Sequence, residues 1–260
     1  MTVRSVRKAV GVLVAVAESH GPISLTEVAA KAGIPIATAS RLLATLTETS
    51  LLKRNGKGYS LGVRAFEIGK SAEKVLDLIE ISRPHLRFLA DETGENANLA
   101  VLDGTDAVYL ACEECSKMVR AFIVQGARVP AHATGVGKVL LSGLEDAEIE
   151  EAYRGATLVR FTSRTVTGVE ELLGEVRKAR ENGYAPDEGE REEGVLCFAA
   201  PIRDYDGRIA AAVSVSGPSS RLGRSRAGSQ RKTLECAKRI SIELGWDGVR
   251  IWQPGPRRSR

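Results

Sequence analysis

Small polar side chains recur at alternate positions in two segments near residue 200 whose composition predicts β-strands. Ser214 and Ser216 are two residues apart, so both side chains point to the same face of a strand. In the preceding segment, Cys197 has the same parity as Val195 and Ala199. Together these residues predict a concave face that leaves room for a small molecule. The alternative interpretation is a set of small core residues packed beneath a helix.

A second feature is the start of a predicted helix at Thr134-Gly135-Val136-Gly137. Exposed backbone N–H groups at the start of a helix can bind a carboxylate without the help of an arginine. The Gly-x-Gly-Lys order does not have the spacing of a nucleotide-binding P-loop. We therefore expect no nucleotide cofactor at this position.

Cysteine and histidine allow two other kinds of chemistry. Cys112 and Cys115 form a CxxC pair, but no second pair accompanies it, so we expect reduced thiols. His132, Asp187 and Cys197 have the side chains of a zinc site in a metal-responsive protein, although their spacing is no metal motif. A second alternative is an enzyme that uses Cys197 as its nucleophile and His132 as its general base. No acid–base constellation supports that reading, so we expect neither an enzyme nor a cofactor.

The segment 24–46 predicts a helix, a tight turn and a second helix. Ser24 is a natural N-cap, and Glu27 completes a capping box. Gly33 ends the first helix, and Pro35 favours the first turn of the next one. Two short helices joined by a glycine also occur in many helical domains that do not bind nucleic acid.

The outward face of the second helix is small, almost free of negative charge, and carries a single arginine. This composition suits a helix that lies against base edges in the major groove of DNA. The outward residues are Ile36, Ala37, Ser40, Arg41 and Ala44.

Two short predicted strands, 51–54 and 59–61, follow this helix pair. Asn55-Gly56 in the connection is a strong hairpin signal. With the amphipathic helix expected at 5–19, the segment predicts a winged helix-turn-helix. Basic side chains at or near the hairpin tip, which can neutralise DNA phosphates, are Lys53, Arg54 and Lys57.

Charge is unevenly distributed along the 260 residues, although the net charge is only +4. Residues 1–69 contain nine Lys or Arg and four Asp or Glu, whereas residues 70–220 contain 17 and 26. The basic N-terminal part is therefore the part expected to meet a polyanion. No apolar run approaches the roughly 18 residues that span a bilayer. Polar residues replace a signal-peptide cleavage site after residue 17, so we expect a cytoplasmic protein with no membrane partner.

Several ordered blocks along nearly the whole chain resemble the IclR family of transcriptional regulators. The blocks are RSVRKAVGVL, ISLTEVAAKAGIP, TASRLLATL, YSLG, GARVPAHATGVGKVLLS, ENGYAPDEGEREEGVLCFAAPI and AAAVSVSGP. One departure concerns the second helix of the segment 24–46, which would be the recognition helix. The family usually has a basic or polar residue where this chain has Ile36, and a serine where it has Ala37. The resemblance then suggests that Ile36 touches a thymine methyl group, while Thr38, Ser40 and Arg41 make the polar contacts.

The resemblance also implies a site for a small organic or aromatic acid. The backbone at Gly135 and Val136 would hold the effector carboxylate. The remaining implied contacts are Asp187, Cys197, Ser214 and Ser216, with Met118, Ala121, Val129 and Val195 as apolar wall. Asp187 beside an anionic ligand needs a partner, and Arg128 and Arg191 are the candidates.

The expected fold class is α+β. A winged helix-turn-helix domain (1–62) is joined by a linker helix (63–77) to a second domain (78–247), followed by a basic tail (248–260). The resemblance implies that the second domain is a GAF-like effector-binding domain. The second domain should contain an antiparallel sheet, because strands, helices and strands follow one another. We expect strands at 98–102, 107–111, 119–124, 195–202 and 209–216, and helices at 135–142, 147–153, 168–182 and 229–244.

Three further details of this domain are expected. Thr167 and Glu170 predict a capping box for the helix at 168–182. Pro84 predicts a kink or restart in the helical segment 78–93. In the linker helix, Phe66 and Ile68 should pack on a partner subunit or the hairpin. The expected assembly is a homodimer, or a dimer of dimers, on a palindromic double-stranded operator.

Overall fold

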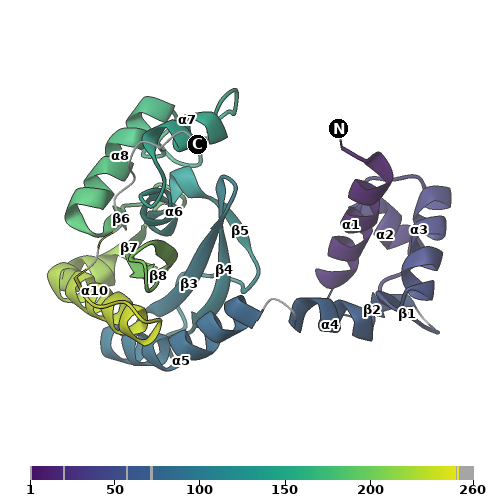
Figure 1. The fold of residues 1–260 in the computed structure, drawn as a ribbon, viewed down its shortest axis with the longest axis horizontal. Helices are drawn as coiled ribbons and strands as arrows, with labels where there is room; N and C mark the ends of the chain where they lie inside the picture. The colour runs from purple at the N-terminus through teal and green to yellow at the C-terminus, as the bar shows by residue number, and fades with distance from the viewer. Residues whose placement is uncertain (1, 20, 57, 71–72, 250, 252–260) are drawn as a thin grey trace. The chain divides into compact units, whose positions relative to one another are not determined.

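The computed structural model describes residues 2–19, 21–56, 58–70, 73–249 and 251. The chain divides into two compact units, Met1–Leu76 and Asp77–Arg260 (Figure 1). The expected division at 62 and 77 stays a prediction, as does the tail at 248–260, which lies mostly outside the described residues.

The N-terminal unit is a winged helix-turn-helix, as predicted. Its elements are α1 (Arg4–Ala17), α2 (Leu25–Lys31), α3 (Ile36–Glu48), β1 (Leu52–Asn55), β2 (Gly58–Leu61) and α4 (Val63–Lys70). The apolar stripes of the first three helices meet in one core with the hairpin. Its buried members are Val12, Val16, Ile23, Val28, Leu43, Leu46 and Leu52.

Local contacts explain why this unit adopts its shape. The Ser24 Oγ accepts from the Glu27 N–H, and the Glu27 carboxylate accepts from the Ser24 N–H, which confirms the capping box. Hydrogen bonds from Ser24 lower the pKa of Glu27. Gly33 has φ of 61°, the left-handed conformation that the tight turn requires. Ile23 pairs with Tyr59 and so ties the loop before α2 to the hairpin.

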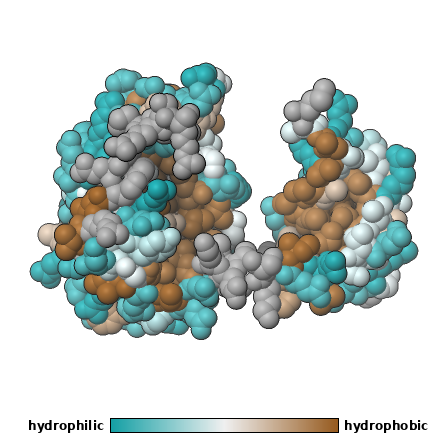
Figure 2. All heavy atoms as spheres, in the orientation of Figure 1, coloured by the Kyte–Doolittle hydropathy of each residue, from teal (hydrophilic) through white to brown (hydrophobic). Residues whose placement is uncertain are grey.

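One face of α1 is apolar and exposed. Val3, Val6, Val10 and Val14 follow one another at helical spacing and are about half exposed or more. Figure 2 shows this apolar surface on the N-terminal unit. Phe66 and Ile68 on α4 are also exposed, and their packing on a partner or on the hairpin stays a prediction.

The C-terminal unit is built on a six-stranded antiparallel sheet in the order β5-β4-β3-β8-β7-β6. Its strands are β3 (Asn96–Asp103), β4 (Asp106–Glu113), β5 (Arg128–Pro130), β6 (Ala185–Asp187), β7 (Val195–Arg203) and β8 (Ile209–Pro218). The helices are α5 (Glu73–Thr93), α6 (Gly135–Leu141), α7 (Asp146–Ala152), α8 (Val169–Asn182), α9 (Ser219–Leu222) and α10 (Arg226–Glu243).

Helices cover both faces of this sheet. On one face, α5 and α10 run side by side over a core that includes Leu89, Phe198, Val213 and Ile240 (Figure 1). On the other face, α6 packs through Val136 and Val139 against small residues of the strands. The expected fold class is thereby confirmed.

Two local predictions are wrong, those for residues 119–124 and for Thr167. Residues 119–124 are not a strand, because β5 occupies the edge of β4 where such a strand would pair. Thr167 does not cap α8: the N-cap is Gly168, and Thr167 Oγ1 instead accepts from Arg160. Pro84 lies inside α5, so the chain does not restart there, and the predicted kink, the other alternative, stays a prediction. Helix α4 spans Val63–Lys70, and residues 71 and 72 lie outside the described ones, so the bounds of the linker helix stay a prediction.

Within the described residues, no helix is both long and apolar enough to cross a lipid bilayer.

Candidate functional sites

The outward face of α3 forms the candidate DNA surface. Ala39, Leu43 and Leu46 are buried, and the opposite side leaves Ile36, Ala37, Ser40 and Arg41 exposed. Thr38 is half-buried. Because this face bears no acidic side chain in its first three turns, it can approach DNA without charge repulsion.

The hairpin β1–β2 supplies further positive charge beside this helix. Lys53 lies opposite Ser60 and Arg54 opposite Tyr59, and both basic side chains are exposed. Adjacent strand residues point to opposite faces, so the two side chains diverge. The Arg54 guanidinium lies 5.9 Å from the Tyr59 ring centroid. Lys57 lies outside the described residues. The assignment of these residues to DNA contacts stays a prediction.

In the C-terminal unit, polar side chains form a row across four strands. Asp187 on β6 pairs with Cys197 on β7, Cys197 pairs with Ser216 on β8, and Ser216 pairs with Asn96 on β3. Directly opposed residues in an antiparallel sheet share a face. The row therefore lies on one side of the sheet, the side that α6 covers.

A neighbouring row holds Ser214, which pairs with Ala199 and with Asn98. Asn98 Nδ2 donates to Ser216 Oγ at 3.0 Å and lies 3.3 Å from Ser214 Oγ. Its Oδ1 is buried and has no hydrogen-bond partner among the described residues. Sequence reasoning missed Asn98, although it is the first residue of a predicted strand and lies two residues after Asn96.

A cavity of about 510 Å³ opens on this polar row, and we call it the inner cavity. Its walls include seven of the residues implied by the family resemblance: Ala121, Val129, Val136, Asp187, Val195, Cys197 and Ser216. The structure does not place the other three on its wall. Met118 is 95% exposed, while Gly135 and Ser214 are buried behind the wall.

The inner cavity also has walls that the sequence did not indicate. They include Tyr109, Phe122 and Glu192. Thr134, at the predicted helix start, and Arg191, one of the two suggested partners of Asp187, also line the cavity. Burial raises the pKa of the Tyr109 hydroxyl, so Tyr109 is a neutral phenol. Residues 121–124 reach the cavity as a loop, held by a hydrogen bond of 2.8 Å from Asn96 Nδ2 to the Ala121 carbonyl.

Asp187 is stabilised by backbone N–H groups. Its Oδ1 accepts from Gly189 at 3.1 Å and from Glu190 at 2.8 Å. Burial nevertheless raises its pKa. Within the described residues neither suggested arginine pairs with it: Arg128 pairs with Asp103 and Asp106, and the Arg191 guanidinium stacks 4.0 Å from the Phe161 ring centroid.

Helix α6 is anchored by a buried ion pair just behind the inner cavity. Lys138 is 1% exposed, and its Nζ lies 2.5 Å from Glu190 Oε1 and 3.7 Å from Glu175 Oε2. Burial raises the pKa of Glu190 to about 7 despite this lysine. Since Glu190 adjoins Arg191 and Glu192, the pair joins α6 to the segment that lines the cavity.

The start of α6 lies very close to the residues before it. Thr134 Oγ1 accepts from the Gly137 N–H at 3.2 Å and caps the helix. A Cβ atom added to Gly137 would lie 2.2 Å from the Ala131 carbonyl oxygen. Only glycine therefore permits this approach, which sets the position of Val136 on the cavity wall.

His132 is not part of the inner cavity wall. Its Nε2 lies 3.1 Å from the Val159 carbonyl oxygen, and its ring stacks on Phe161. No group of three His, Cys, Asp or Glu side chains suited to a metal occurs in the part of the chain described. The metal alternative therefore lacks its ligand set.

The cysteines lie in surroundings that disfavour reactive thiolates. Burial raises the pKa of the Cys197 thiol, which disfavours a nucleophilic role. Cys112 and Cys115 are free, and burial raises the pKa of Cys112 to about 11.

Comparison with known proteins agrees with this architecture. A model of the IclR helix-turn-helix domain matches residues 5–56, and one of the bacterial transcriptional regulator IclR C-terminal domain matches residues 70–242. HTH-type transcriptional regulator BhcR of Paracoccus denitrificans is 34% identical over 93% of this chain and 88% of its own length. Transcriptional repressor IclR of Escherichia coli is 32% identical over 94% and 90%.

Solved structures share the whole fold. The crystal structure of IclR from Thermotoga maritima matches with a TM-score of 0.71 at 28% identity, covering 93% of this chain and 99% of that one. An IclR homologue of Microbacterium hydrocarbonoxydans, in complex with 4-hydroxybenzoate, matches with a TM-score of 0.80 at 25% identity, covering 92% and 98%.

A winged helix-turn-helix unit followed by an α/β unit with an internal cavity defines a DNA-binding transcriptional regulator. The matches over both units make the family certain. The chain belongs to the IclR family of bacterial transcriptional regulators.

Proposed function

We propose that a small organic or aromatic acid controls DNA binding by this regulator from the inner cavity. The observation that carries the proposal is the polar row Asp187–Cys197–Ser216, which opens into a cavity of about 510 Å³. A space of this size suits a small ligand, and its mixture of apolar and polar walls suits an aromatic or short aliphatic acid.

The chemistry of the walls supports an acidic ligand with a second polar group. Arg191 lines the cavity, and its guanidinium, which stacks on Phe161, makes no ion pair among the described residues. The carboxylate of the ligand would lie near the backbone at Gly135 and Val136, and a ligand hydroxyl would meet Asp187 or Ser216. The 4-hydroxybenzoate complex of the Microbacterium homologue is consistent with this class of ligand.

On DNA, α3 would read base edges, and Lys53 and Arg54 would neutralise phosphates. One recognition helix reads few base pairs, so we propose that two copies bind a palindromic operator. The exposed valine face of α1 is a surface on which two copies of the N-terminal unit could pair. The ligand would favour one of two arrangements of the assembly, and the linker helix α4 would transmit that preference.

A thermal-shift screen of aromatic and aliphatic carboxylic acids tests the proposal, because a specific ligand stabilises the folded state by mass action. A hit should raise Tm in a concentration-dependent manner and change a gel-shift titration on the chain's own promoter fragment. Ala121→Trp, which fills the inner cavity, should abolish both effects. Equal binding to every duplex tested would contradict operator recognition.

A further inference from the structure

A second cavity, of about 490 Å³, adjoins the first, and we call it the outer cleft. Val195 lines both cavities. The residues just before it are divided between them, with Asp187 and Arg191 on the inner side and Glu188 and Glu193 on the outer. The segment 188–195 is therefore a wall that the two spaces share.

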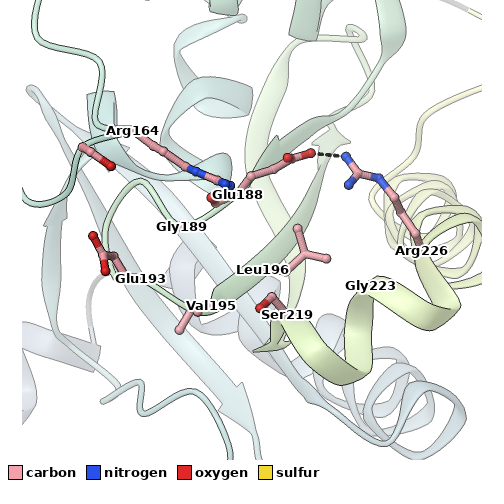
Figure 3. Close-up of a pocket in the computed structure, with 11 residues that line it drawn as sticks. Arg164, Glu188, Gly189, Glu193, Val195, Leu196, Ser219, Gly223 and Arg226 are labelled. Atoms are coloured by element: carbon pink, nitrogen blue, oxygen red, sulfur yellow. Dashed lines mark hydrogen bonds and ion pairs between the residues drawn. The ribbon is translucent and has the colours of Figure 1, made fainter.

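Charged side chains from three separate parts of the chain meet in the outer cleft. Glu188 lies between Arg164, from the connection before α8, and Arg226, at the start of α10 (Figure 3). The Glu188 carboxylate pairs with Arg226, while Arg164 Nη1 donates to the Glu188 carbonyl oxygen at 2.8 Å. The Glu188 carboxylate thus occupies the place beside Arg226 that an external anion would otherwise take.

This internal ion pair is easy to replace. The Arg226 side chain is 50% exposed and that of Glu188 is 44% exposed, so solvent screens their attraction. Guanidinium groups bind carboxylate and phosphate oxygens through paired N–H donors. Arg164 and Arg226 both line the cleft, whereas the Glu188 carboxylate is paired only with Arg226.

We propose that the outer cleft is a second ligand site, which takes a small doubly charged oxyanion, either a dicarboxylate or a phosphate. The anion displaces the Glu188 carboxylate from Arg226 and also contacts Arg164. Glu188 then acts as a built-in competitor that sets the affinity. The site lies outside the DNA surface and shares only Val195 with the inner cavity, so it stands independently of the proposed function.

Isothermal titration of the full chain with succinate and, separately, with inorganic phosphate tests this site. At constant ionic strength, at least one probe should bind saturably. Glu188→Ala should tighten binding and Arg164→Met or Arg226→Met should weaken it, each by about tenfold, as expected for a charge-assisted contact. Arg226→Lys keeps the charge without the paired donors and should give an intermediate affinity. The probe that binds distinguishes a dicarboxylate from a phosphate site.

Two control variants isolate the outer cleft. Glu151→Ala frees Arg154 from a more exposed ion pair elsewhere and should not alter binding. Ala121→Trp fills the inner cavity and should leave the probe affinity unchanged. The proposal is overturned if neither probe binds Glu188→Ala saturably, if the arginine variants match wild type, or if Ala121→Trp removes binding.

Discussion

Lys138 and Glu190, 52 residues apart in the sequence, form a buried ion pair with 2.5 Å between Nζ and Oε1. The pair links α6, which carries Val136, to the segment that carries Arg191 and Glu192. Glu190 Oε2 is buried and has no hydrogen-bond partner among the described residues. The attraction of Lys138 is therefore the main interaction that offsets the desolvation of the Glu190 carboxylate.

Replacing this lysine should destabilise the C-terminal unit strongly. Lys138→Met removes one partner of a buried pair and should lower the free energy of unfolding by about 3 kcal/mol. Urea denaturation measures the change. Lys178→Met is the matched control, because Lys178 pairs with Glu175 at the surface and should cost less than about 1 kcal/mol. Equal losses in the two variants would contradict the role of burial.

The burial of Glu190 should make stability depend on pH. The pKa of Glu190 is about 7 in the folded protein, above its ordinary value of 4.5, so the folded state holds a proton that the unfolded state releases. Stability should therefore fall as pH rises from about 4.5 to 7. Denaturation of wild type and Glu190→Gln at several pH values checks this. The glutamine variant should show a shallower dependence, and identical slopes would count against it.

Arg41 is the one cationic side chain on the outward face of α3. Arg41→Ala should weaken operator binding by about 1–3 kcal/mol, because a base-edge or phosphate contact is lost. A gel-shift titration measures the effect, with Arg154→Ala in the C-terminal unit as the control. Ligand affinity should stay the same. An unaltered titration would remove α3 from the DNA surface.

A bulky residue in the inner cavity should separate ligand response from DNA binding. Ala121→Trp fills space beside the polar row, so ligand-induced stabilisation should disappear while operator affinity persists. Ser214 is a poor place for this test, because it is 1% exposed and within hydrogen-bonding distance of Asn98. Val159→Trp, at an exposed position, provides the control. A normal ligand response in Ala121→Trp would place the ligand elsewhere.

Local patterns were enough to predict much of the fold. The Ser24–Glu27 box and the Asn55-Gly56 hairpin depend on residues close in sequence, and the structure contains both. The common face of Cys197 and Ser216 follows from strand parity, and their pairing confirms it.

Contacts between residues far apart in the chain could not be predicted from local sequence patterns. Lys138 resembles a surface lysine until Glu190 is folded against it, and no local pattern indicates that contact. Residues 119–124 are mostly apolar, as in a buried strand, but β5 already takes the neighbouring edge. The walls contributed by Arg191 and Phe122 likewise depend on how loops fold back over the sheet.

Gly137 fixes the position of the first turn of α6, and with it the part of the inner cavity wall that Val136 forms. Even an alanine methyl group there would meet the carbonyl oxygen of Ala131, and the first turn of α6 would have to lift away. Val136 and the Thr134 hydroxyl would move with it. The dimensions of the inner cavity, where we propose that the ligand binds, therefore depend on the absence of a side chain at residue 137.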